Sequence, residues 1–99
     1  MVTLVVYDIS KNRERLIVDH LCRDYGLQRV QDSVFRGAID AKKRKKLVKS
    51  IESESHQDHE DTWDVQIYFI SDDDFKTHHC FGPEGARPDP EETEDVVFI

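Results

Sequence analysis

The sequence has few of the residues that mark secreted or membrane proteins. Two cysteines, Cys22 and Cys80, occur among its 99 residues, a number and spacing that fit neither a disulfide framework nor a CxxC metal knuckle. The apolar runs are a few residues long, far below the roughly 20 that cross a bilayer. The N-terminus opens on a strand-like run without the basic flank and apolar stretch of a signal peptide. We therefore expect a cytoplasmic protein without a membrane partner.

Basic residues are almost absent from the second half of the chain. Residues 1–50 hold 12 Lys and Arg against 6 Asp and Glu, whereas residues 51–99 hold 2 against 15. The two halves therefore carry +6 (12 − 6) and −13 (2 − 15), which sum to the −7 of the whole chain. The basic half favours an anionic partner, but neutralisation between halves or between subunits explains the same asymmetry.

The hydrophobic patterns predict one α+β domain over residues 1–76. Its predicted strands are residues 2–8, two short strands or one long kinked strand within 27–39 with a break at Asp32-Ser33, and residues 63–70. Its predicted helices are residues 11–25, capped by Ser10 and ended by Gly26, and residues 41–52, capped by Asp40, with a short helical turn at 71–74. The order β-α-β-β-α-β is the ferredoxin-like split βαβ pattern.

Two helices can cover only one face of such a sheet. The predicted core-facing stripes are Leu16, Ile17, Leu21 and Tyr25 on the first helix, and Leu47, Val48 and Ile51 on the second. Apolar residues on the far side of the first and fourth strands then need another cover, and a second copy in a homodimer is the simplest one. Residues 77–95 are predicted to be a Pro-, Gly- and acid-rich tether, and residues 96–99 an extra strand that pairs with the partner subunit or folds back on its own sheet.

Asp8 is the most informative position. It ends an apolar strand on the face of Val2, Leu4 and Val6, where an unpaired charge costs several kcal/mol. One interpretation is a turn aspartate that caps the backbone of Ser10 and Lys11. In a two-fold dimer, by contrast, two Asp8 carboxylates can converge, and they repel unless they share a proton or a hard cation such as Mg²⁺ or Mn²⁺. Such a cation can activate water for attack on a phosphodiester.

Two segments carry a resemblance to a known family. Tyr7-Asp8-Ile9 follows the first strand, and the string YGLQRVQDSVFRG occupies residues 25–37. Together they closely resemble the CRISPR-associated protein two family, the small dimeric nuclease-like subunit of the spacer-acquisition machinery. The resemblance implies a cytoplasmic ferredoxin-like homodimer with metal-dependent phosphodiesterase activity on RNA or DNA in some members. It also implies association with the CRISPR integrase subunit, whose dimers it bridges while holding the DNA fragment to be inserted.

The resemblance also assigns roles to residues. Asp8 matches the metal-binding catalytic carboxylate, and the residues that border the cleft are Tyr7, Arg29, Ser33 and Phe35. Arg13 and Arg15 match the arginine-bearing first helix loosely, and Asp32 departs from the pattern by adding negative charge. Each cleft residue has an ordinary alternative, namely a cross-strand ion pair for Arg29, a turn for Ser33, and the core for Tyr7 and Phe35.

Other polar clusters invite further interpretations. The segment 42–49 contains six basic residues in eight, which is either a solvated helix face or a contact for a phosphate backbone through Lys42, Lys43, Arg44, Lys45 and Lys46. His56, His59, His78 and His79 lack the spacing of a zinc site. The acidic stretch 84–95 is a solvated tether, a mimic of a phosphate run, or a dock for a basic surface.

Three functions are compatible with these patterns. The first is a spacer-acquisition subunit with a Mg²⁺-dependent nuclease centre at paired Asp8 residues. The second is a toxin-type endoribonuclease of related fold without an integrase partner. The third is a non-enzymatic regulatory domain that binds a small ligand at a dimer interface.

Overall fold

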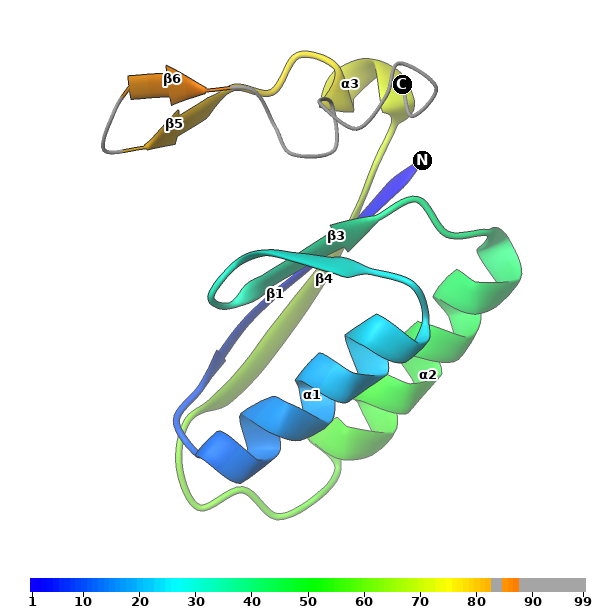
Figure 1. Cartoon of the computed structure of the whole chain (residues 1–99). Helices are drawn as coiled ribbons and strands as arrows, with labels where there is room; N and C mark the ends of the chain where they lie inside the picture. The colour runs from blue at the N-terminus through cyan, green and yellow to red at the C-terminus, as the bar shows by residue number, and fades with distance from the viewer. Residues whose placement is uncertain (83–84, 88–99) are drawn as a thin grey trace.

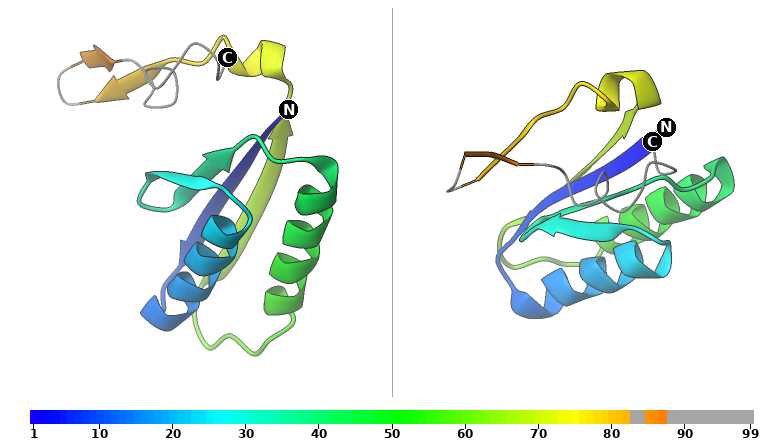
Figure 2. Two further views of the ribbon diagram at one scale, coloured as in Figure 1. Left: turned by 45° about the vertical axis from the view of Figure 1, so that its right-hand side comes forward. Right: turned by 45° about the horizontal axis from the view of Figure 1, so that its top comes forward.

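The computed structural model of the chain describes residues 1–82 and 85–87, and its main body is a four-stranded antiparallel sheet (Figure 1). The strands are β1 (Val2–Ile9), β2 (Gln28–Gln31), β3 (Val34–Gly37) and β4 (Trp63–Ile70), in the spatial order β2-β3-β1-β4. Helices α1 (Asn12–Asp24) and α2 (Ala41–Ser55) lie on the same face of the sheet (Figure 2). This is the predicted ferredoxin-like α+β arrangement.

Strand β1 is central and divides the molecule into two faces. It pairs with β3 on one side and β4 on the other, both antiparallel. Successive side chains of a strand point to opposite faces, and Val5, Tyr7 and Ile9 are buried in the core beneath the helices. On the opposite face Leu4 and Val6 are half-buried and Asp8 is exposed. We call this second face, which α1 and α2 leave uncovered, the open face.

Helix α1 differs from the prediction in its start and in its buried side. Its N-cap is Lys11, without a side-chain cap, rather than the predicted Ser10. Ser10 lies one residue outside the cap, where its backbone N–H donates to the Thr62 carbonyl at 3.0 Å. The buried residues are Val18, Asp19 and Cys22. Leu16 and Ile17, predicted to face the core, are 54% and 40% exposed.

The ends of the helices follow local signals that the sequence displays. Gly26 has a φ of 96°, and the N–H groups of Gly26 and Leu27 donate to the carbonyls of Arg23 and Cys22, which is a Schellman C-cap. At the start of α2 the Asp40 side chain accepts from the Lys43 N–H at 2.8 Å. Both predicted caps are confirmed, although α2 extends three residues past its predicted end at residue 52.

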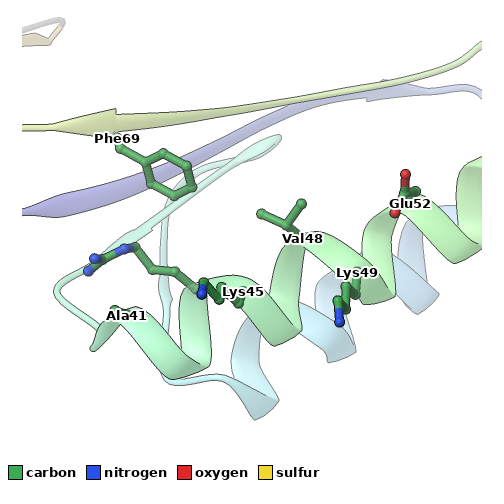
Figure 3. A pocket seen from close by; sticks show the side chains of 7 residues that line it. Ala41, Lys45, Val48, Lys49, Glu52 and Phe69 are labelled. Atoms are coloured by element: carbon green, nitrogen blue, oxygen red, sulfur yellow. The ribbon is translucent and has the colours of Figure 1, made fainter.

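Helix α2 buries fewer apolar residues than predicted. Leu47 and Ile51 are in the core, whereas Val48 is 37% exposed. Val48 lies instead on the flank of α2 that faces the edge strand β4 (Figure 3). The apolar stripe by which α2 contacts the core therefore consists of Leu47 and Ile51 alone, and Val48 lies at the surface.

The segment after β4 is more regular than a tether. The predicted helical turn at 71–74 is the short helix α3 (Asp72–Phe75), which begins one residue later than expected because Ser71 is its N-cap and accepts from the Asp74 N–H at 3.1 Å. Strands β5 (Cys80–Gly82) and β6 (Gly85–Arg87) then form a separate two-stranded sheet inside the segment predicted as a tether. The predicted strand at 96–99 lies outside the described residues. Among the described residues no helix has the length and apolar content that a membrane span requires.

The packing of the two helices predicts unequal effects of one substitution. Leu47 is fully buried, whereas Leu16 is 54% exposed. Leu47→Ala should lower the free energy of unfolding by about 2–5 kcal/mol because it leaves a cavity, whereas the control Leu16→Ala should change it by less than about 0.5 kcal/mol. Urea titrations of both variants measure this, and equal losses would contradict the assigned face of α1.

Candidate functional site

Asp8 projects from the open face near the end of β1 and is paired in register with Asp64 of β4. Both side chains are exposed. Directly opposed residues in an antiparallel pair have Cβ atoms about 4.5–5.5 Å apart, so like charges there oppose strand pairing. The chain thus places two carboxylates side by side at one end of the open face, where they cost stability.

A row of polar side chains continues from Asp64 along β4. The Gln66 amide donates to the Asp64 carboxylate at 3.2 Å, and the Tyr68 hydroxyl donates to the Gln66 side-chain oxygen. Our sequence interpretation missed Asp64 as a site residue. The alternation of β4 does put Asp64, Gln66 and Tyr68 on one face, but only the register of β4 against β1 shows that Asp64 faces Asp8.

The capping interpretation of Asp8 is wrong. Within residues 1–82 and 85–87 the Asp8 carboxylate makes no hydrogen bond or ion pair. With respect to the described residues it is therefore available to a ligand. Two exposed carboxylates are oxygen donors of the type that Mg²⁺ and Mn²⁺ prefer, and Mg²⁺ is commonly held by one or two carboxylates with several waters. In the described part of the chain, no three metal-ligating side chains of the His, Cys, Asp and Glu type converge.

Tyr7 lies on the other face from Asp8, in a buried polar cluster. Its hydroxyl donates to the Asp19 carboxylate of α1, and Arg29 of β2 donates to the same carboxylate. Burial, followed by the hydrogen bond to Asp19, raises the pKa of the Tyr7 phenol. Arg29 therefore forms its ion pair with a residue of α1, and not with a neighbouring strand as we considered. Tyr7 is a core residue, which was the ordinary alternative to a place at the border of a cleft.

Phe35 and Ser33 both lie beside β1, the strand that carries Asp8. Phe35 is fully buried, and the guanidinium groups of Arg23 and Arg29 lie 5.4 and 5.6 Å from the centroid of its ring. Ser33 is in the β2–β3 turn, where its carbonyl accepts from the Tyr7 N–H at 3.0 Å. Within one chain, Tyr7, Arg29 and Phe35 therefore lie behind the sheet from Asp8, and their role at the border of a cleft stays a prediction.

The predicted basic contacts are mostly exposed. On α1, Arg13 and Arg15 are exposed, with Arg15 donating to Asn12. On α2 the lysines 42, 43, 45 and 46 are exposed, and their side chains form no ion pair with any described residue. Arg44 differs, because it donates to the Ile39 carbonyl at 2.8 Å and lies 5.9 Å from the Phe69 ring centroid.

His59 is held by contacts on both of its ring nitrogens. Its Nδ1 lies 2.6 Å from the Glu14 carboxylate and its Nε2 lies 2.8 Å from the Glu54 carbonyl. Both oxygens can only accept, so the ring satisfies both when it carries two protons. The ring also stacks on Trp63 with centroids 4.8 Å apart. His59 thereby fastens the loop before β4, and hence the start of the strand that carries Asp64, to α1.

Of the two cysteines, Cys22 is a free thiol. Cys22 is buried in the core, and this burial raises the pKa of its thiol to about 12. Cys22 is therefore a neutral core residue at physiological pH, not a nucleophile or a metal ligand.

The protein is thus a small ferredoxin-like domain in which the helices cover one face of the sheet. The other face is open and carries exposed acidic residues. The model of one family, the CRISPR associated protein Cas2, matches residues 1–78. The chain belongs to this family.

Known proteins agree with this assignment. A protein from Archaeoglobus fulgidus named CRISPR-associated endoribonuclease Cas2 1 is 43% identical over 51 residues, which cover 52% of this chain and 54% of that protein. A CRISPR-associated endoribonuclease Cas2 from Korarchaeum cryptofilum is 30% identical over 79 residues, covering 80% and 82%. The crystal structure of Cas2 from Streptococcus pyogenes superposes with a TM-score of 0.66 at 25% identity, covering 83% of this chain and 100% of that one. The first curated relatives are matched over only about half their length.

The contacts of His59 predict a pH dependence of stability. The hydrogen bond to Glu14, followed by that to the Glu54 carbonyl, raises the pKa of His59 above its ordinary value. Folding therefore favours the protonated ring, so this contribution is fully present below about pH 6.5, the unfolded value, and is lost as the pH rises through the folded pKa.

The measurement is urea unfolding of the parent, His59→Gln and the control His56→Gln at pH 6 and pH 9. The parent and the His56 variant should lose more stability between the two pH values than the His59 variant. An identical pH dependence of all three proteins would contradict the assignment.

Proposed function

We propose that the protein is a homodimeric, metal-dependent endonuclease of the CRISPR spacer-acquisition machinery, with a phosphodiesterase site formed by Asp8 of both copies. The observation that carries this proposal is the position of Asp8, which is exposed on the open face beside a second carboxylate and has no partner among the described residues of its own chain. Membership in the Cas2 family and the endoribonuclease names of its relatives support it.

The open face supports a second copy as the missing cover. Leu4 and Val6 are half-buried there and Tyr68 is 47% exposed. Near the start of β1 this face is already covered, because the Phe75 ring of α3 packs at 5.0 Å from the guanidinium of Arg36. The uncovered remainder runs toward Asp8. A two-fold axis through this remainder would bury the apolar residues and bring two Asp8 side chains together.

The residues at this end of the open face fit a hard divalent cation. Asp8 of both copies would hold Mg²⁺ or Mn²⁺, and Asp64 would lie beside the ion as a second source of negative charge. When bound, the cation lowers the pKa of a coordinated water and stabilises negative charge on the phosphodiester. The protein itself contributes a rigid position for Asp8, because the neighbouring Tyr7 is anchored in the core.

Nucleic acid would be held by its backbone. The exposed lysines of α2 and the arginines 13 and 15 of α1 supply positive charge without base-reading geometry, which predicts binding independent of sequence. The relatives' names favour RNA as a substrate of cleavage, whereas the integrase-bridging role implied by the family requires DNA. In this proposal residues 96–99 add a strand to the partner subunit at the edge of β4.

The carboxylate site makes a prediction about Asp8. Asp8→Asn should abolish Mg²⁺- or Mn²⁺-dependent cleavage of RNA or DNA, with a loss greater than about 100-fold, because even outer-shell changes at metal sites cost 10- to 100-fold. Asp64→Asn should cost about 10- to 100-fold by the same rule. Cleavage assays with the control Asp24→Asn, an exposed aspartate of α1, measure the difference.

Integration provides an independent reading of the same variant. In a complex with the integrase subunit, the Asp8 variant should still support insertion of a DNA fragment, because bridging depends on surfaces and not on hydrolysis. Full cleavage by the Asp8 variant would refute the active site. Loss of integration with an intact dimer and complex would refute the separation of the two roles.

Backbone binding predicts a specific dependence on salt. Lys42→Gln combined with Lys46→Gln should weaken binding of duplex DNA and reduce the slope of log affinity against log salt by about 1.8, or about 0.9 for each phosphate that the protein no longer neutralises. The matched control removes two lysines elsewhere, Lys11→Gln and Lys76→Gln. Gel-shift titrations at several salt concentrations test this, and an affinity that does not depend on salt would favour the small-ligand regulatory domain instead.

A further inference from the structure

A groove lies between α2 and the edge strand β4 and has a volume of about 420 Å³ (Figure 3). Its apolar floor contains Ala41, Val48 and Phe69, with Val48 37% and Phe69 47% exposed. Because Ala41, Lys45, Val48 and Glu52 recur at helical spacing of three or four residues, they form one flank of α2. Apolar side chains are thus left uncovered beside an unpaired strand edge.

The rim of the groove is strongly basic. Arg44, Lys45 and Lys49 line it, and Glu52 is the single acidic residue among its lining. The side chains of Lys45 and Lys49 form no ion pair with any residue in the described ranges. The groove is therefore complementary to a segment in which acidic residues lie directly beside apolar ones.

The chain itself contains such a segment at its C-terminus. Glu91, Glu92, Glu94 and Asp95 are followed at once by Val-Val-Phe-Ile at 96–99. Beyond β6, which ends at Arg87, the chain has 12 more residues, 88–99, and 12 residues can span at most about 40 Å at roughly 3.3 Å per residue. This reach is comparable to the longest dimension of the molecule, 42 Å.

We propose that the acidic run 91–95 of the partner subunit docks on the basic rim of this groove, with its residues 96–99 over Val48 and Phe69, and that it competes with nucleic acid for Lys45 and Lys49. The inference rests on the dimer and the backbone-binding surface proposed above, and it adds an inhibitory role for the acidic tail. Docking places four carboxylates near basic side chains that otherwise face solvent. Nucleic acid then binds tightly only when the acidic run 91–95 is displaced from these lysines, and residues 96–99 can stay paired with the partner.

The test compares full-length variants of equal net charge. The tail variant is Glu91→Gln, Glu92→Gln, Glu94→Gln and Asp95→Asn together, and its control is Asp24→Asn, Asp58→Asn, Asp73→Asn and Asp74→Asn together, which removes four acidic residues elsewhere. If the tail leaves about a tenth of the grooves open, the tail variant should bind duplex DNA about tenfold more tightly than the control. Equal affinities of the two variants would overturn the inference.

An uncharged change in the groove provides the second arm. Val48→Ser and, separately, Phe69→Ser remove apolar surface on which residues 96–99 are proposed to dock, and they do not alter the net charge. Each should tighten DNA binding in the parent and add nothing in the tail variant. Groove substitutions that weaken or do not change DNA binding while the protein stays folded and dimeric would contradict the proposed seat.

The lysine variant separates this inference from the function on which it rests. If Lys42→Gln with Lys46→Gln binds DNA as tightly as the parent, the nucleic-acid surface proposed for α2 is wrong. If that variant weakens binding while the tail variant behaves like its charge-matched control, the surface stands and only the inhibitory tail is refuted.

Discussion

The alternation of side chains along β1 is the constraint on which the rest of the structure depends. Val5, Tyr7 and Ile9 are buried beneath the two helices, and β1 is hydrogen-bonded on both edges. A shift in register by one residue would exchange the two faces, burying Asp8 and exposing Tyr7. The exposure of Asp8 on the open face is therefore a consequence of core packing. The carboxylate does not need its own supporting contacts to hold its position.

The buried cluster behind the sheet makes this position rigid. Asp19 is only 7% exposed, and a buried carboxylate is tolerated when it is paired and hydrogen-bonded. Arg29 neutralises it, and Tyr7 donates the second hydrogen bond. Because the raised pKa keeps the phenol protonated, the cluster is complete at any physiological pH. It joins α1 and β2 to β1 at Tyr7, the residue before Asp8. Tyr7 and Arg29, which the family resemblance assigns to the border of a cleft, therefore stabilise β1 within one chain.

The order of elements was predictable because its signals are local. Gly26 and Asp40 set helix ends through contacts within a few residues, and the alternation of β4 is visible from Trp63 to Tyr68. The buried side of α1 was not predictable, because apolar residues at 16, 17, 18, 21 and 22 offer two overlapping faces, and packing under the sheet selects that of Val18 and Cys22. Predicting that Asp64 lies beside Asp8 would have required the register of β4 against β1. Predicting that Asp19 is buried would have required knowing that Arg29 lies next to it. Both are long-range facts that a single sequence does not display.

We expect that two copies meet over the open face and that their Asp8 side chains share one cation. A crystal structure of the dimer grown with Mn²⁺ measures this directly. The ion should lie between the two Asp8 carboxylates, with each ligating oxygen about 2.1 Å from it and the two carboxylates within about 6 Å of one another. A dimer whose Asp8 residues lie on opposite flanks of the assembly, or an ion bound away from them, would contradict it.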